Sequence, residues 1–381
     1  MQKTKISFLV ALIFGILLLS SPLLAIKADV KEPKADPLNV AFITGTGGLG
    51  DQSFNDLGYA GCMMAKEEGL CTFVMSEPDE ISEFEGLQEN YASNDSIDLI
   101  VTLGYDQASA VNKTAKAHPE VPIVLIDMVV VQGKVRSVTF KAGEGSFLVG
   151  AMAGLMTEAG KIGFIGGKDD FLIEEFYAGF AAGIVHATRN YTENADPTIL
   201  KNFVGDWSDP AKGKSLAEGV IAEGADVIYA AAGLSGLGVI EAVNETDEDV
   251  WLIGVDADQD HLIPGKVLTS MVKRVDLAVY QAIKDLYDDK WTADIQTLGL
   301  KENAVGISAL KYTKDDIGTA NIKIVNETIR GHILDGTLEV PTTYEDLCDL
   351  YNVCPATAPG FELLFVLGAL ALVPILLRRK K

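Results

Sequence analysis

Two apolar runs in the second half of the chain end in side chains that suit ligand binding. One begins at Trp251 and ends at Asp256, and the other extends from Val267 to Val272 and closes on Lys273. In an open α/β sheet, ligands bind outside the carboxyl ends of the strands, where both charges are expected. A carboxylate there can accept hydrogen bonds from the two hydroxyl groups of a ribose or another sugar. Lys273 could keep that carboxylate ionised and donate to the ligand, although two solvated surface charges are the alternative.

A glycine-rich segment follows the first expected strand. Gly45 to Gly50 matches G-x-G-x-x-G, which cradles a pyrophosphate in dinucleotide-binding enzymes but is also a frequent coincidence. Asp51 or Ser53 then suits the N-cap of a helix, which leaves Phe54 where a phosphate would otherwise lie. An aromatic ring at this edge suits stacking on a planar ligand, whereas a core position in the first helical turn is the alternative.

The strands and helices that must position these residues form two consecutive series. Apolar strands alternate with helical patterns, which predicts parallel sheets. Two series of similar size predict an α/β protein with two doubly wound lobes and a cleft between them. The expected strands are 39–44, 72–76, 99–103, 123–127 and 137–140 in the first series, and 161–165, 199–204, 227–231 and 250–255 in the second.

The composition agrees with two lobes outside the cell. The 381 residues are 48% hydrophobic, which is enough for two cores. The net charge of −23 argues against nucleic acid as a partner, because phosphate contacts dominate that affinity, and favours a self-repelling soluble surface. Near the N-terminus, Lys3 and Lys5 precede an apolar run in the layout of a secretory signal. We therefore expect a signal peptide at 1–28 and a linker at 29–37.

The C-terminal region has the character of a membrane anchor. Residues 361–377 are mostly apolar and precede four basic residues. This span is at the short edge of the roughly 17–25 residues of a membrane helix, and the basic end would stay cytoplasmic. We expect a tether at 341–358, an anchor or sorting signal at 359–381, and the globular part on the extracellular face. Pro359-Gly360-Phe361 resembles an archaeal signal whose helix is replaced by a lipid, and a retained helix is the alternative.

The four cysteines suit an oxidising compartment. Cys62 and Cys71 flank one expected helix, and Cys348 and Cys354 flank a short loop. Two local disulfides fit these positions, but four cysteines allow three pairings and the sequence does not choose among them. The spacings match no zinc pattern and the histidines are scattered, so we expect neither a metal nor a cofactor.

Several segments together resemble one family. The chain is similar to the basic membrane proteins, which are substrate-binding proteins of ABC transporters and whose purine-nucleoside-binding, PnrA-like members are best understood. The resemblance covers roughly residues 38–340. No segment is specific alone, but their order and combination are. They are Gly47 to Asn55, Gly143 to Gly150, Gly163 to Gly167, Asp209 to Lys214, Ala230 to Val239, Gly254 to Gln259 and Leu268 to Asp276.

This resemblance implies a fold and a function. The fold would be the type I periplasmic-binding-protein fold, with one lobe of 38–140 plus about 268–300 and another of 141–267 plus about 301–340, joined by a hinge. The protein would be a monomer that captures a nucleoside, a purine nucleoside first, and delivers it to the permease subunits without catalysis. The alternatives are a binder of another small solute such as a sugar, a ligand-sensing lobe of a receptor, and a nucleoside-processing enzyme. An enzyme would need a metal-binding acid cluster or a placed general acid, which the sequence does not offer.

The resemblance also implies roles for individual residues. In the family, one aromatic from each lobe sandwiches the base, while an acid and a lysine hold the ribose. The family's acid nine residues before the first aromatic is replaced by Gly45, so base recognition stays open. Asp127, at the end of a strand, suits either the rim or the hinge. The expected ligand-binding residues are the rings of Phe54 and Trp207, the ribose contacts Asp256 and Lys273, the base-edge contact Asn55, the backbone at Gly233, and the rim residues Ser53, Tyr105 and Asp106.

Overall fold

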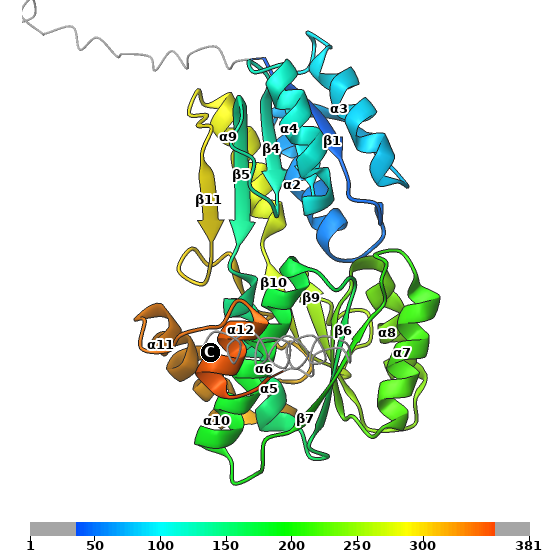
Figure 1. Ribbon diagram of the computed structural model, residues 1–381, viewed down its shortest axis with the longest axis vertical. Helices are drawn as coiled ribbons and strands as arrows, with labels where there is room; N and C mark the ends of the chain where they lie inside the picture. Colours follow the sequence, from blue (N-terminus) through cyan, green and yellow to red (C-terminus); the bar gives the residue numbers. More distant parts are fainter. Residues whose placement is uncertain (1–35, 355–381) are drawn as a thin grey trace, which may run out of the picture. The chain divides into compact units, whose positions relative to one another are not determined.

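Two six-stranded sheets organise residues 36–354, which the computed structural model describes (Figure 1). Residues 37–354 belong to one compact unit. The first sheet has the strand order β11-β5-β4-β3-β1-β2 and is parallel. We call this sheet and its helices the first lobe. Its strands are β1 (Leu38–Ile43), β2 (Cys71–Ser76), β3 (Leu99–Leu103), β4 (Pro122–Ile126), β5 (Lys134–Phe140) and β11 (Ile295–Leu298).

The second sheet has the strand order β12-β10-β9-β8-β6-β7 and forms the second lobe with its helices. Its strands are parallel except that β12 runs antiparallel to β10. The expectation of two doubly wound lobes is therefore confirmed. The strands are β6 (Lys161–Gly166), β7 (Thr198–Phe203), β8 (Val227–Ala231), β9 (Trp251–Asp256), β10 (Val267–Lys273) and β12 (Val305–Ile307).

Helices cover both faces of each sheet. In the first lobe, α2 packs beside α9 and α3 beside α4, and in the second lobe α5 packs beside α6 and α7 beside α8. Figure 1 shows the pair α5 and α6 on the opposite face of the second sheet from α7 and α8. The helices are α2 (Phe54–Glu67), η1 (Ile81–Glu83), α3 (Phe84–Ala92), η2 (Tyr105–Gln107), α4 (Ala108–Ala117), α5 (Ala142–Met156), α6 (Phe171–Tyr191), α7 (Pro210–Ala222), η3 (Gly233–Ser235), α8 (Gly236–Glu245), α9 (Val275–Tyr287), α10 (Lys314–Lys323), η4 (Ile324–Ile329), α11 (Arg330–Leu334) and α12 (Tyr344–Tyr351).

The central strand β1 shows why its sequence is apolar at successive positions. Val40 and Phe42 belong to the core that includes α2 and α9, whereas Ala41 and Ile43 belong to the core that includes α3 and α4. All four side chains are fully buried. Because helices cover both faces of the sheet, each position along the strand must be apolar.

The glycine segment from Gly143 to Gly150 has a packing role. A Cβ atom at Gly150 in α5 would lie 2.1 Å from the carbonyl oxygen of Phe180 in α6. In the opposite direction, a Cβ at Gly183 in α6 would lie 2.1 Å from the carbonyl oxygen of Phe147 in α5. The two helices can approach this closely only where a side chain is missing.

Within residues 36–354, the chain crosses between the lobes three times, from β5 to α5, from β10 to α9 and from β11 to β12. The boundary expected at about residue 268 is therefore wrong. β10 forms hydrogen bonds with β9 and β12, so Val267 to Lys273 belong to the second lobe. The return to the first lobe begins at α9, whose partner is α2.

The tether expected at 341–358 is also wrong for the residues that the structure describes. Thr343 caps α12 by accepting a hydrogen bond from the Asp346 amide, and the helix packs against α6 with Leu347 fully buried. A disulfide joins Cys348 to Cys354.

Cys62 and Cys71 are buried free thiols, so the second local disulfide is not formed in this structure. No helix within 36–354 has both the length and the hydropathy to cross a bilayer. The expected signal peptide, the linker up to residue 35 and the expected anchor at 359–381 lie outside the described residues.

Candidate ligand-binding site

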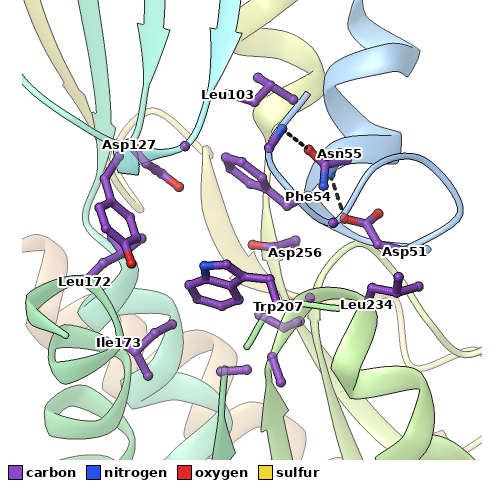
Figure 2. A pocket seen from close by; sticks show the side chains of 18 of the residues that line it. Asp51, Phe54, Asn55, Leu103, Asp127, Leu172, Ile173, Trp207, Leu234 and Asp256 are labelled. Atoms are coloured by element: carbon purple, nitrogen blue, oxygen red, sulfur yellow. Dashed lines mark hydrogen bonds between the residues drawn. The ribbon is translucent and has the colours of Figure 1, made fainter. Parts of the chain in front are cut away.

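A cavity lies where the carboxyl ends of strands from both lobes meet (Figure 2). About 700 Å³ of space between the lining atoms belongs to it, including the part that is open to solvent. All of the expected ligand-binding residues except Ser53 line it. Sequence reasoning missed the apolar part of the wall, which includes Leu103 from the first lobe and Leu172, Ile173, Phe176 and Leu234 from the second. The cavity is thus mostly apolar with a few converging polar groups.

Two aromatic rings from different lobes line this cavity. Phe54 is the first residue of α2, and Trp207 lies in the loop between β7 and α7. Figure 2 shows the two rings on either side of the same space. The indole of Trp207 lies directly on the backbone of Gly167, where a Cβ atom would come within 2.2 Å of Cζ3. Gly167 thereby allows the ring to lie flat against the loop that follows β6.

Asp256 ends β9 and lines the cavity, and its two carboxylate oxygens have different surroundings. Its other oxygen, Oδ2, accepts a hydrogen bond of 2.7 Å from the Ser53 hydroxyl of the first lobe. Oδ1 is buried and has no hydrogen-bond partner among the described residues. Burial raises the pKa of Asp256, while Lys273 and the Ser53 hydroxyl act in the opposite direction. Ser53 itself is fully buried and does not line the cavity, and its hydroxyl contacts the Asp256 carboxylate, which does.

Lys273 ends β10 and pairs with a different acid from the one expected. Its Nζ donates to Oδ2 of Asp127, which follows β4 in the first lobe. The ammonium also lies 4.9 Å from the ring centre of Phe54, 5.2 Å from that of Phe140 and 5.6 Å from that of Phe176. Both side chains of the ion pair are almost fully buried, and both residues line the cavity.

Asp127 is therefore a site residue that the sequence left between two roles. It has a left-handed backbone with φ of 70°, and Asp256 has the same feature with φ of 62°. Aspartate tolerates this conformation better than most residues. In both strands, the turn of the backbone at the strand end leaves a carboxylate at the cavity wall.

Carboxylates accept hydrogen bonds from backbone N–H groups of the glycine-rich loop and of the start of α2. Leu49 N donates to Glu77 Oε2 and Gly50 N donates to Asp56 Oδ1, each at 2.8 Å. Asp51 accepts from the backbone N–H groups of Ser53 and Asn55, each at 2.9 Å, and from that of Asp56 at 3.2 Å. Acidic groups therefore satisfy the N-terminus of α2, where an anion would otherwise bind. Burial raises the pKa of Asp51 to about 6.

The side chains of Tyr105 and Asp106 line the rim but bind the opposite lobe. The Tyr105 hydroxyl donates to Asp170 Oδ2 at 2.7 Å, and Lys168 Nζ lies 3.4 Å from Asp106 Oδ2. Burial and the hydrogen bond to Asp170 both raise the pKa of Tyr105. These polar atoms are thus engaged in contacts between the lobes.

Gly233 and Asn55 complete the expected set. Gly233 begins η3 with a φ of 56°, a conformation that favours glycine, and its backbone lies beside the Trp207 ring. Asn55 accepts a hydrogen bond of 2.8 Å from Gly45 N through its side-chain oxygen. Within 36–354, no group of three or more His, Cys, Asp or Glu side chains is arranged to hold a metal ion.

Known proteins resemble this chain in sequence and in structure. An uncharacterized lipoprotein of Pyrococcus abyssi is 33% identical over 286 residues, which cover 72% of this chain and 70% of the relative. Basic membrane protein A1 of Borrelia garinii is 31% identical, with 74% of this chain and 85% of the relative covered. The crystal structure of an ABC transporter solute-binding protein from Aeropyrum pernix has a TM-score of 0.76 at 27% identity and covers 80% of this chain and 94% of the other.

These similarities confirm the expected type I periplasmic-binding-protein fold. The model of one family, described as ABC transporter substrate-binding protein PnrA-like, matches residues 38–335, which is most of the described chain. The resemblance inferred from the ordered sequence segments is therefore confirmed as well. The chain belongs to this family of ABC transporter substrate-binding proteins.

Proposed function

We propose that this protein is the extracytoplasmic component of an ABC importer and captures a nucleoside, a purine nucleoside first, for delivery to the permease. One observation carries the proposal. Phe54 and Trp207, from different lobes, line the same cavity as the buried Asp256 carboxylate, whose Oδ1 has no partner among the described residues. A nucleoside combines a flat base for the rings with ribose hydroxyl groups for the carboxylate.

The energetics require both parts of the ligand. Stacking contributes about 1–3 kcal/mol per base in comparable settings. A micromolar complex needs roughly −8 kcal/mol, so the rings alone are insufficient. Hydrogen bonds to ionised groups are the stronger kind, and Asp256 and the pair of Lys273 with Asp127 supply them at the cavity wall.

The proposed mechanism is capture by closure. A ligand that touches Phe54 in one lobe and Trp207 in the other binds the closed arrangement more tightly than an open one. It therefore shifts the population toward closure, which the contacts of Tyr105 with Asp170 and of Asp106 with Lys168 also favour. The permease would then recognise the closed pair of lobes.

The proposed location is the outer face of the membrane. Relatives from Pyrococcus are named lipoproteins, which supports attachment to a membrane. The proposed attachment is through the C-terminal segment. The apolar run 361–377, followed by basic residues, suits that role.

Isothermal titration calorimetry of the purified full-length chain tests the proposal. Purine nucleosides are expected to bind, whereas free bases, ribose and hexoses are expected to give no heat at the same concentrations. A thermal shift that grows with nucleoside concentration would agree, since a ligand that binds only the folded state stabilises it by mass action. Binding of a sugar without any nucleoside binding would favour the alternative solute class. Release of free base during incubation would instead indicate an enzyme.

A further inference from the structure

The side-chain amide of Asn55 has a fixed orientation at the cavity wall. The backbone N–H of Gly45 donates to its Oδ1 at 2.8 Å, and the Asn55 backbone N–H is held by Asp51 Oδ2 at 2.9 Å. A backbone N–H can only donate, so the side-chain atom that faces it must be the oxygen. Asn55 is 5% exposed, which leaves little freedom for another rotamer.

This orientation leaves the amide nitrogen for the ligand. None of the described residues accepts a hydrogen bond from Asn55 Nδ2. A Cβ atom at Gly47 would lie 3.4 Å from Nδ2 and 3.9 Å from Cβ of Leu234, and all three residues line the cavity. Asn55 therefore offers two N–H donors at the place where the lobes approach each other, while its oxygen is already engaged.

Two carboxylates in the wall of the first lobe already have other partners. The carboxylate of Asp51, which also lines the cavity, accepts three backbone N–H groups at the start of α2. Gly45 and Gly47 have no side chains. Asp106, on the same lobe, pairs with Lys168.

We infer that the site discriminates among purine nucleosides in favour of those with an oxygen at position 6. An asparagine reads adenine by accepting a hydrogen bond from the 6-amino group while donating to N7. In this protein the Gly45 amide occupies the accepting oxygen, so adenine would bring an amino group against the Asn55 NH2. Hypoxanthine and guanine instead present two acceptors, O6 and N7, on that edge. The inference rests on the proposed function, because it assigns the base edge to Asn55.

A ligand series on the unaltered full-length protein tests the inference without any variant. Inosine, purine riboside and adenosine differ at position 6 by an oxygen, a hydrogen and an amino group. The dissociation constants are expected to rise in that order, with adenosine at least about tenfold weaker than inosine, as for loss of one good paired contact to a base. Equal affinities for the three, or a preference for adenosine, would overturn the inference.

The variant Asn55→Asp supplies the matched experiment. One carboxylate oxygen can still accept from Gly45 N, and the other replaces the NH2 donor with an acceptor. The ratio of the adenosine to the inosine dissociation constant is expected to fall by about tenfold or more relative to the unaltered protein. The melting temperature of the unliganded variant monitors folding, and the ligand series decides the question if the variant does not fold.

The outcomes separate this inference from the proposed function. If the variant weakens both nucleosides by the same factor, Asn55 does not read position 6 and the inference fails while nucleoside capture stands. If the unaltered protein binds none of the three nucleosides, the proposed function fails as well.

Discussion

The variant Asp256→Asn tests the central contact of the proposed site. In the unaltered protein, Asp256 Oδ2 is held by Ser53 while Oδ1 is buried without a partner among the described residues. The variant keeps an oxygen to accept from Ser53 and places an NH2 group where Oδ1 lies. The ligand thereby loses an ionised acceptor but gains no steric clash, because asparagine has the same shape.

The magnitude follows from the charge. A hydrogen bond to a charged group contributes about 1.5–3 kcal/mol, and about 1.4 kcal/mol corresponds to a factor of ten. Nucleoside affinity should therefore fall by roughly 10- to 150-fold. The unliganded variant should be at least as stable as the unaltered protein at neutral pH, since it removes the cost of burying an ionised carboxylate.

The pH dependence gives a second readout. Burial raises the pKa of Asp256 above its ordinary value of 3.8. The folded state then binds this proton more tightly than the unfolded state, so ionisation costs stability above the ordinary pKa and the cost disappears as the pH falls toward it. The stability advantage of Asp256→Asn should accordingly be largest at neutral pH and shrink in acid.

Calorimetry with a purine nucleoside and chemical denaturation without ligand measure the two effects. Asp258→Asn is the matched control, because it removes the same charge two residues away at an exposed position that does not line the cavity. It should leave affinity unchanged. The reasoning is refuted if Asp256→Asn binds as tightly as the unaltered protein, or if its unliganded form unfolds so readily that the lost affinity reflects misfolding.

Three further predictions concern the cavity rim, the glycine against which the Trp207 ring packs, and the carboxylate at the N-terminus of α2. Tyr105→Phe removes the donor to Asp170, so stopped-flow measurements should show ligand release accelerated by about 5- to 20-fold with the order of ligand preference unchanged. Gly167→Ala places a Cβ atom 2.2 Å from the present position of the Trp207 ring, so calorimetry should show at least about tenfold weaker binding. Burial raises the pKa of Asp51 to about 6, so its ionisation costs stability above that pH. Denaturation should show that the free energy of unfolding of the unaltered protein, compared with that of Asp51→Asn, increases by on the order of 2–3 kcal/mol as the pH falls from about 6 to about 4.

The strand pattern could be predicted because helices cover both faces of each sheet. The expected strand 250–255 corresponds to β9 at Trp251–Asp256, and its burial on both faces produces the continuous apolar run that was recognised. The same logic places Asp256 at a carboxyl end, beside the cavity. The position of a residue along one strand depends on its sequence neighbours, so it could be predicted from the sequence.

Neighbouring residues in the sequence do not show which sheet a strand joins or which acid a lysine pairs with. Residues 267–273 have the apolar pattern of a buried strand, but only hydrogen bonds to β9 and β12 assign them to the second lobe. Similarly, Asp127 and Asp256 both follow strand ends, and nothing in the spacing shows that Lys273 pairs with Asp127. Such pairings depend on how two sheets are brought together by three crossings. The α12 helix was missed because a short helix capped by Thr343 and closed by a disulfide resembles a polar linker in composition.

The polar groups of the cavity also connect the lobes, which joins recognition to closure. Ser53 belongs to the first lobe and holds Asp256 of the second, and Lys273 of the second lobe holds Asp127 of the first. Separation of the lobes would leave these buried charges without their partners. The charges would then have to be solvated or paired again before the site could bind a ligand. The Asp256 carboxylate keeps its orienting contact with Ser53 only when the lobes are together. Under the proposed function, a ligand that hydrogen-bonds to Asp256 Oδ1 would favour this same arrangement of the lobes, so ligand binding and lobe closure would be coupled equilibria.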